Sequence, residues 1–119
     1  MQAPRPRALV VDDDPALRML IRVNLELEGF DVTEAATVLE ADAAVRGQRP
    51  DVVLLDVHLG GVPSHDLLAR LRADGLPVAL VTGSVEVEDY RSRADAVVAK
   101  PFVPQELVEI ARRLARVGT

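Results

Sequence analysis

The sequence predicts a single α/β domain built on a doubly wound, five-stranded parallel sheet with helices on both faces. Short apolar runs alternate five times with segments of helical periodicity. Most of these runs are apolar throughout and end in a polar residue, as strands buried on both faces of a parallel sheet do. The chain has 119 residues, of which 49% are apolar, so it is long enough for one such core and too short for two.

The first strand and helix have clear start signals. Residues 1–7 contain two prolines and are expected to be a flexible lead, followed by one domain over residues 8–118. Ala8–Val11 is the first apolar run. Asp14 then supplies a helix N-cap, and Pro15 occupies the first helical position. Apolar residues at helical spacing follow, until a glycine at position 29 ends this helix.

The remaining elements follow from similar signals. Thr37 and Glu40 have the spacing of a capping box, which predicts that the second helix begins there. A short and irregular fourth helix is expected between Val85 and Arg93. The other expected elements are strands at 30–33, 52–56, 77–82 and 96–100, with helices that end near Gly47, Gly75 and Gly118.

Composition and charge argue against several classes of function. The formal charge of −5 and the three aromatic residues disfavour direct nucleic-acid binding. The chain has no cysteine, which excludes a thiol nucleophile, a cysteine-based zinc site and a disulfide scaffold. No apolar run approaches the length of about 18 residues that a membrane helix needs, and no signal peptide is recognised. A cytoplasmic protein without membrane contact is therefore expected.

Polar residues at the ends of four predicted strands mark a candidate site. They are Asp12 and Asp13, Asp56, Thr82 and Lys100. Ligands of open parallel sheets bind outside the carboxyl ends of the strands. We therefore expect these five side chains to converge on one edge of the sheet.

Their chemistry suits phosphoryl transfer. Clustered carboxylates repel one another unless a cation relieves them, and an all-oxygen set favours Mg²⁺ or a similar hard ion such as Mn²⁺. Lys100 would add a fixed positive charge, Thr82 a hydroxyl donor, and one carboxylate could be the nucleophile. Lys100 is also the only lysine beside thirteen arginines. Either the site needs a compact ammonium or the placement is chance, and the sequence leaves both readings open.

Four motifs together resemble the receiver domain of two-component response regulators. They are Val10–Asp13, Asp56, Thr82 and Lys100–Phe102. The motifs occur in the same order as in the family, and the resemblance covers residues 8–117. The resemblance implies a flavodoxin-like fold with strand order 2-1-3-4-5 and about five helices. It also implies a signalling module, not an enzyme, although such a module promotes its own phosphorylation and dephosphorylation.

The resemblance implies a role for each site residue. Asp13 would ligate Mg²⁺ directly and Asp12 mostly through water, with Asp56 and the backbone carbonyl of His58 completing the set. Asp56 would be the phospho-acceptor, taking its phosphoryl group from a sensor histidine kinase, a phosphotransfer protein or a small phosphodonor.

The same resemblance implies how the phosphoryl group is held and read. Lys100 would bind it, Thr82 would move toward it, and the bond before Pro101 is commonly cis in the family. A downstream protein effector would read the switch, and a homodimer is possible.

The chain also departs from the family pattern. Leu59–Gly60 replaces the usual Met-Pro, which predicts a more mobile loop after the acceptor. Val97 stands where the family usually has the Tyr or Phe that swings inward on phosphorylation. Residues 82–100 form a segment about one helical turn shorter than usual. Tyr90, within it, is compatible with either a packing or a functional role.

Two alternatives remain open. Asp12 and Asp14 echo the Asp-x-Asp signature of haloacid-dehalogenase-like phosphatases, with Asp12 as nucleophile. Pro15 and Ala16 do not fit that signature, and 119 residues leave no room for a cap domain. The other alternative is a receiver-like interaction scaffold that no longer uses phosphate, which Val97 and the short fourth helix favour and the complete acidic set opposes.

Overall fold

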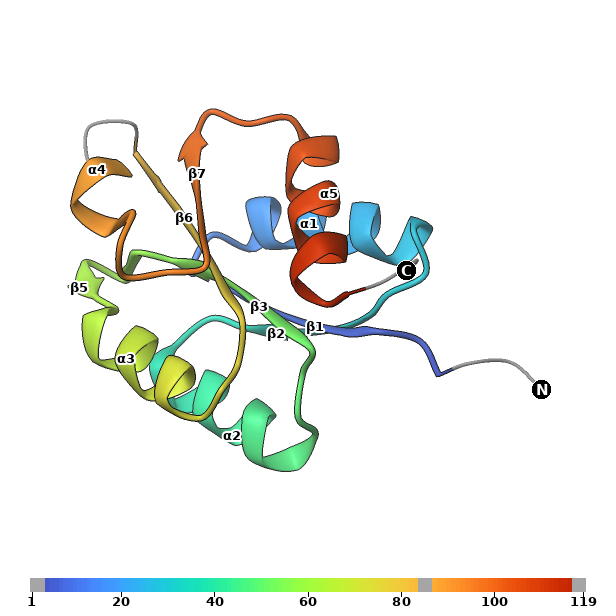
Figure 1. Cartoon of the computed structure of the whole chain (residues 1–119), viewed down its shortest axis with the longest axis horizontal. Helices are drawn as coiled ribbons and strands as arrows, with labels where there is room; N and C mark the ends of the chain where they lie inside the picture. The colour runs from blue at the N-terminus through green and yellow to red at the C-terminus, as the bar shows by residue number, and fades with distance from the viewer. Residues whose placement is uncertain (1–3, 84–86, 117–119) are drawn as a thin grey trace.

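The computed structural model describes residues 4–83 and 87–116. In that part of the chain, a parallel sheet has the strand order β2-β1-β3-β6-β7 (Figure 1). Counting only the strands of this sheet, the order is 2-1-3-4-5, as predicted. The strands are β1 (Arg7–Val11), β2 (Asp31–Ala35), β3 (Val52–Asp56), β6 (Val78–Gly83) and β7 (Ala96–Lys100).

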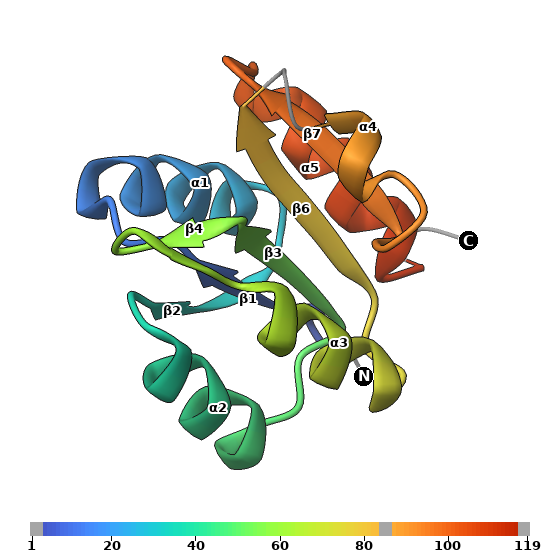
Figure 2. The ribbon, with the colours of Figure 1, turned by 90° about the vertical axis from the view of Figure 1, so that its left-hand side faces the viewer.

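Helices cover both faces of the sheet, which confirms the doubly wound architecture (Figures 1 and 2). One face carries α1 and α5, and the other carries α2 and α3, with α4 beside β7. The bounds are α1 (Pro15–Leu27), α2 (Val38–Gly47), α3 (His65–Ala73), α4 (Val87–Tyr90) and α5 (Pro104–Leu114).

The core is split into two layers by the alternation of side chains along the strands. Leu9 and Val11 of β1 face the cluster that includes α2 and α3, whereas Ala8 and Val10 face the cluster that includes α1 and α5. All five residues of β3, the central strand, are buried. Burial on both faces explains why β3 reads as an uninterrupted apolar run until its last residue, Asp56.

The start of α1 is fixed by the predicted cap. The Asp14 side chain accepts hydrogen bonds from the backbone amides of Ala16 (3.0 Å) and Leu17 (3.3 Å), and Pro15 is the first helical residue. At the other end, Gly29 has a φ of +95°, the left-handed conformation that favours glycine after a helix. The aspartate cap and the glycine thus fix where α1 begins and ends in the chain after β1.

The start of α2 is fixed by Thr37. Its hydroxyl oxygen accepts from the amide of Glu40 at 3.1 Å, and a Glu40 carboxylate oxygen accepts from the amide of Ala36 at 2.8 Å. The reciprocal bond of the capping box therefore reaches one residue further back than the simplest form of the motif.

We expect Thr37→Ala to lower the free energy of unfolding by about 1 kcal/mol, because the Glu40 amide loses its acceptor. Urea unfolding followed by circular dichroism measures this loss. Thr37→Ser keeps the hydroxyl and should restore most of the stability. Equal stability of the Thr37→Ala and wild-type proteins would show that the cap contributes nothing.

The structure adds an element that the sequence analysis did not predict, a small antiparallel ribbon in the loop after β3. It consists of β4 (His58–Leu59) and β5 (Val62–Pro63), joined by two glycines. Gly60 and Gly61 have φ values of +60° and +81°, as a type I′ hairpin turn requires. The loop thus has regular structure, and the greater mobility expected of it stays a prediction.

Smaller differences concern element ends. Strand β1 begins at Arg7, one residue before the predicted strand. Helix α4 is short, with four residues within the expected range, and the expected limit Val85 lies outside the described residues. The Lys100–Pro101 bond is cis, as the resemblance implies. Helix α5 ends at Leu114, and the predicted closing residue Gly118 lies outside the described residues. Of the helices in the described ranges, none has the length and apolarity to cross a membrane.

Candidate functional site

Three aspartates meet where β1 and β3 end. Asp12 and Asp13 follow β1 directly, and Asp56 is the last residue of β3, which pairs with β1 in parallel. One carboxylate oxygen from each lies within 4.8 Å of the others. Asp12 and Asp56 are buried while Asp13 is exposed, so the cluster opens to solvent on one side.

The other two predicted site residues come from the neighbouring strands β6 and β7. The Lys100 ammonium nitrogen lies 3.5 Å from an Asp56 carboxylate oxygen. Thr82 is buried, and among the described residues its hydroxyl has no hydrogen-bond partner. An unpartnered buried hydroxyl is uncommon because burying it costs free energy. Asp12, Asp13, Asp56 and Lys100 therefore lie together, as the strand-end rule predicts, and Thr82 lies near the end of the neighbouring strand β6.

The ribbon after β3 contacts the same cluster through its backbone. The His58 amide donates to an Asp56 carboxylate oxygen at 3.4 Å, and the Gly60 amide donates to an Asp13 carboxylate oxygen at 3.1 Å. The exposed His58 therefore lies next to the site, and the role of its carbonyl as a metal ligand stays a prediction.

Burial raises the pKa of both inner carboxyl groups above the ordinary value of 3.8. For Asp12, desolvation is the main cause, and repulsion from the Asp56 and Asp13 carboxylates raises the pKa further. For Asp56, desolvation again outweighs the opposing attraction of Lys100. The folded protein therefore disfavours the charged form of both carboxyl groups.

We expect Asp12→Asn to stabilise the metal-free protein at pH 7 by roughly 1 kcal/mol, because the neutral amide avoids desolvation and repulsion. The folded-state pKa of Asp12 is raised, so the wild-type protein gains stability from this group as pH falls through that pKa toward 3.8. The advantage of the variant should therefore shrink as the pH approaches 4. Urea unfolding between pH 4.5 and 8 measures it. A variant less stable than the wild type throughout this range would contradict the prediction.

The donor set fits a hard divalent cation. Its charged groups are carboxylate oxygens close enough to share one ion, with neither sulfur nor imidazole required, which suits Mg²⁺ or Mn²⁺. Such an ion would relieve the repulsion that raises the pKa of Asp12. Its protein ligands would come from two adjacent strand ends, leaving other positions for water or phosphate oxygens.

Comparison with known proteins decides the family. A family model described as the response regulator receiver domain matches residues 8–112. The chain belongs to the response regulator receiver domain family. It is therefore a receiver domain of two-component signalling, in which phosphorylation is typical.

Similar proteins support this assignment. The chain is 42% identical to the DNA-binding response regulator MtrA of Mycolicibacterium smegmatis, over 98% of this chain and 53% of MtrA. It is 43% identical to the probable transcriptional regulatory protein TcrX of Mycobacterium tuberculosis, over 91% of this chain and 49% of TcrX. The receiver thus spans about half the length of the curated relatives it matches.

Solved structures agree with the fold. The receiver domain of NtrX from Brucella abortus superposes with a TM-score of 0.85 at 30% identity, covering 92% of this chain and 98% of that one. A CheY-like receiver domain protein from Methanospirillum hungatei JF-1 gives 0.83 at 31% identity, covering 95% and 96%. The flavodoxin-like receiver fold is confirmed.

Two polar residues beside the receiver site were missed in the sequence analysis. Arg18 of α1 donates from Nη1 to the backbone carbonyl of Asp12 at 2.7 Å. Ser64 is buried, and its hydroxyl lies 2.8 Å from the carbonyl oxygen of Asp56 and 2.9 Å from that of Val57. The sequence contains one indication that Arg18 makes a specific contact, because a cation in the first turn of a helix is disfavoured by the helix dipole. A serine before a helix is an ordinary N-cap candidate, yet Ser64 makes no side-chain cap bond.

Tyr90 and Val97 show how this receiver differs from the usual pattern. Val97, at the usual aromatic position, is half-buried and packs against the core. Tyr90 of α4 is 6% exposed, and its hydroxyl is hydrogen-bonded to Nε2 of His65 at the start of α3. The Arg93 guanidinium lies 5.4 Å from the Tyr90 ring centroid, within cation–π range. The buried ring is thus a packing residue that also ties α4 to α3.

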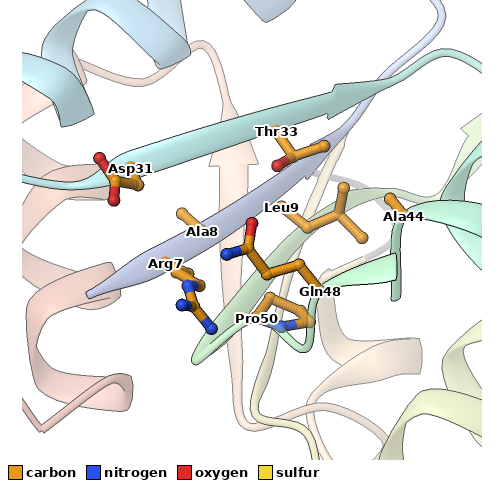
Figure 3. Close-up of a pocket in the computed structure, with 8 residues that line it drawn as sticks. All are labelled: Arg7, Ala8, Leu9, Asp31, Thr33, Ala44, Gln48 and Pro50. Carbon is orange, nitrogen blue, oxygen red and sulfur yellow. The ribbon is translucent and has the colours of Figure 1, made fainter. Parts of the chain in front are cut away.

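A pocket at the other end of the receiver sheet is unrelated to this site. Figure 3 shows it between the start of β1, β2 and the end of α2, where Arg7, Asp31 and Gln48 line it. The acidic cluster lies beyond the opposite end of β1. The site therefore has to be located by the chemistry of its residues, since the pocket contains none of the predicted site side chains.

Proposed function

We propose that this receiver accepts a phosphoryl group on Asp56 in a Mg²⁺-dependent reaction and thereby switches its protein interactions. The observation that supports this most is the position of the Asp56 carboxylate. One of its oxygens lies within 4.8 Å of an oxygen of Asp12 and of Asp13, and the Lys100 ammonium lies 3.5 Å from an Asp56 oxygen. A nucleophile close to both a cation site and an ammonium suits attack on a charged phosphoryl group.

In this proposal the acidic cluster holds the metal ion. Asp13, exposed at the rim, ligates it directly, Asp12 does so mostly through water, and Asp56 and the His58 carbonyl complete the protein ligands. Bound Mg²⁺ or Mn²⁺ supplies neutralisation of charge on the phosphoryl oxygens. Asp12 is buried, and one of its oxygens already accepts from the Asp14 amide at 2.9 Å, which suits an indirect role.

The reacting residues divide the remaining work. An Asp56 carboxylate oxygen attacks phosphorus, the bond from phosphorus to the donor nitrogen or oxygen breaks, and the donor leaves with the bonding pair. Lys100 offsets the charge of the transferred group, and the Thr82 hydroxyl donates to one of its oxygens. That hydroxyl has no partner among the described residues, so it is available for this bond.

The partners follow from this chemistry. A sensor histidine kinase or a phosphotransfer protein would supply the phosphoryl group, and a downstream protein effector, or a second copy of the chain, would read the change. MtrA is named as a DNA-binding regulator, and this chain spans about half of it. With a formal charge of −5, the segment itself is proposed to contact proteins and not DNA.

The phosphatase alternative loses its main support. Its signature would need Asp14 beside Asp12, but Asp14 is exposed and its side chain caps α1 by accepting from two backbone amides. The proposed receiver is accordingly a signalling module, with no substrate besides its own phosphoryl donor.

The test is direct phosphorylation of the purified protein. We expect incubation with Mg²⁺ and acetyl phosphate or phosphoramidate to add one phosphoryl group, about 80 Da by intact mass spectrometry, and EDTA to prevent it. A receiver of known activity is the positive control. If that control is labelled and this protein is neither labelled nor able to bind beryllofluoride, the proposal is wrong.

The scaffold alternative is favoured by one observation, the small Val97 at the usual switch position. It predicts no saturable Mg²⁺ binding, or binding that does not change in Asp13→Asn. A phosphorylated protein whose partner affinity is the same with and without phosphate would also support it.

A further inference from the structure

Arg18 reaches from the first turn of α1 to the peptide that joins the two metal-facing aspartates. Its Nη1 donates to the Asp12 carbonyl oxygen at 2.7 Å, and its side chain is only 17% exposed. We propose that Arg18 is a positioning residue that raises the metal affinity of the acidic cluster by fixing the Asp12–Asp13 peptide. This inference rests on the proposed function, because it concerns the same cation site.

The position of this peptide decides where the Asp13 carboxylate lies. Sheet hydrogen bonding ends at the Asp12 amide, which donates to the Ala35 carbonyl at 3.0 Å. Beyond it the chain has no strand or helix until Pro15. A peptide unit is planar, so a hydrogen bond to the Asp12 oxygen orients the whole plane, including the nitrogen and Cα of Asp13. Arg18 supplies that bond.

Arg18 is itself held from the other side. Its Nε lies 2.8 Å from one carboxylate oxygen of Glu34 on β2, while Arg22 Nε lies 2.7 Å from the other oxygen of Glu34. The guanidinium therefore bridges a β2 side chain and the end of β1. A rigid planar fork suits this double contact, and the flexible point charge of a lysine does not.

The charge of Arg18, taken alone, would not favour metal binding. The first turn of α1 contains no acidic residue, and the Arg18 charge is offset from outside that turn, by Glu34 on β2. The same charge repels a cation bound at the neighbouring aspartates. The two possible effects of Arg18 on metal affinity consequently have opposite signs: the charge weakens binding, and the hydrogen bond to Asp12 strengthens it.

This opposition gives a sharp test, with Arg22 as the matched control. Arg18→Gln and Arg22→Gln each remove one positive charge from α1 and one ion pair with Glu34. Arg22→Gln also removes the exposed Arg22–Glu26 pair, but only Arg18 contacts Asp12. Mn²⁺ binding to the full chain, measured by electron paramagnetic resonance of free Mn²⁺, reports affinity without any phosphodonor. We expect Arg18→Gln to weaken Mn²⁺ binding about tenfold, and Arg22→Gln to change it by less than roughly twofold.

Two further measurements separate positioning from general stability. Arg18→Lys keeps the positive charge but not the planar guanidinium, so it should also weaken Mn²⁺ binding. If Arg18→Gln does not fold, the Mn²⁺ affinity of Arg18→Lys tests the proposal. In phosphorylation assays, Arg18→Gln should need about tenfold more Mg²⁺ for its half-maximal rate, with little change in the rate at saturating Mg²⁺.

The outcomes are distinct. If Arg18→Gln, or Arg18→Lys where the former is unfolded, binds Mn²⁺ as tightly as the wild type or more tightly, the positioning role is wrong and only charge matters. If the wild type shows no saturable Mn²⁺ binding, or Asp13→Asn binds equally well, the cation site of the proposed function fails, and the inference fails with it.

Discussion

Asp56→Asn will gain no phosphoryl group under conditions that label the wild type. The amide keeps the size of the side chain and its place at the end of β3 but has no nucleophilic carboxylate oxygen. Intact mass after incubation with Mg²⁺ and acetyl phosphate measures the result, with an expected difference of about 80 Da between wild type and variant. The effect should be complete, since among the described residues Asp56 is the carboxylate of the cluster that forms the ion pair with Lys100.

Two control variants make this result specific. Asp31→Asn changes an exposed aspartate at the start of β2, far along the sheet from the site, and should label normally. Asp12→Asn should label more slowly because the metal binds less tightly, yet it should retain the acceptor. If Asp56→Asn is labelled and Asp12→Asn is not, Asp12 is the nucleophile, as in the phosphatase alternative.

Lys100→Gln should lower the rate of phosphorylation by about two to three orders of magnitude, which is typical when one preorganised donor is removed from a developing negative charge. Its ammonium is 3.5 Å from Asp56 in the free protein. The time course of adduct formation at saturating Mg²⁺ measures the rate.

The same substitution has a second, independent consequence for pH. Lys100 lowers the pKa of Asp56, against the larger effect of burial, so its removal leaves that pKa higher. The rate should then reach its half-maximum at a higher pH in Lys100→Gln than in the wild type. Lys100→Arg restores the charge and should return the pH midpoint, while its larger fork restores the rate only in part. A rate within about threefold of the wild type in Lys100→Gln would contradict the role of the ammonium.

The parts of the site that depend on strand ends could be predicted from the sequence. Apolar runs such as Val52–Leu55 give the strands, and the parallel topology then brings Asp12, Asp56 and Lys100 to one edge whatever the details of packing. Local signals also sufficed for the start of α1, because the Asp14 cap depends only on neighbouring amides.

The contacts that cross between elements could not be predicted in this way. Arg18 finds Asp12 and Glu34 only once α1 lies over β1 and β2, and its spacing along α1 does not reveal that partner. A serine before a helix suits an N-cap, yet the Ser64 hydroxyl donates to the carbonyls of Asp56 and Val57. The ribbon is different, because Gly60–Gly61 is a recognisable hairpin signal, but flanking strands of two residues are too short for apolar alternation to show.

The bond from the Gly60 amide to Asp13 links two equilibria. Its acceptor belongs to the Asp13 carboxylate, which the proposed metal ion would also use, so ion binding and this contact of the ribbon each change the free energy of the other. Such linkage is reciprocal. If the ion changes the affinity of a partner protein for the ribbon by some factor, binding of that partner changes the affinity for the ion by the same factor. The concentration of free divalent cation would then set partner affinity even before any phosphoryl group arrives.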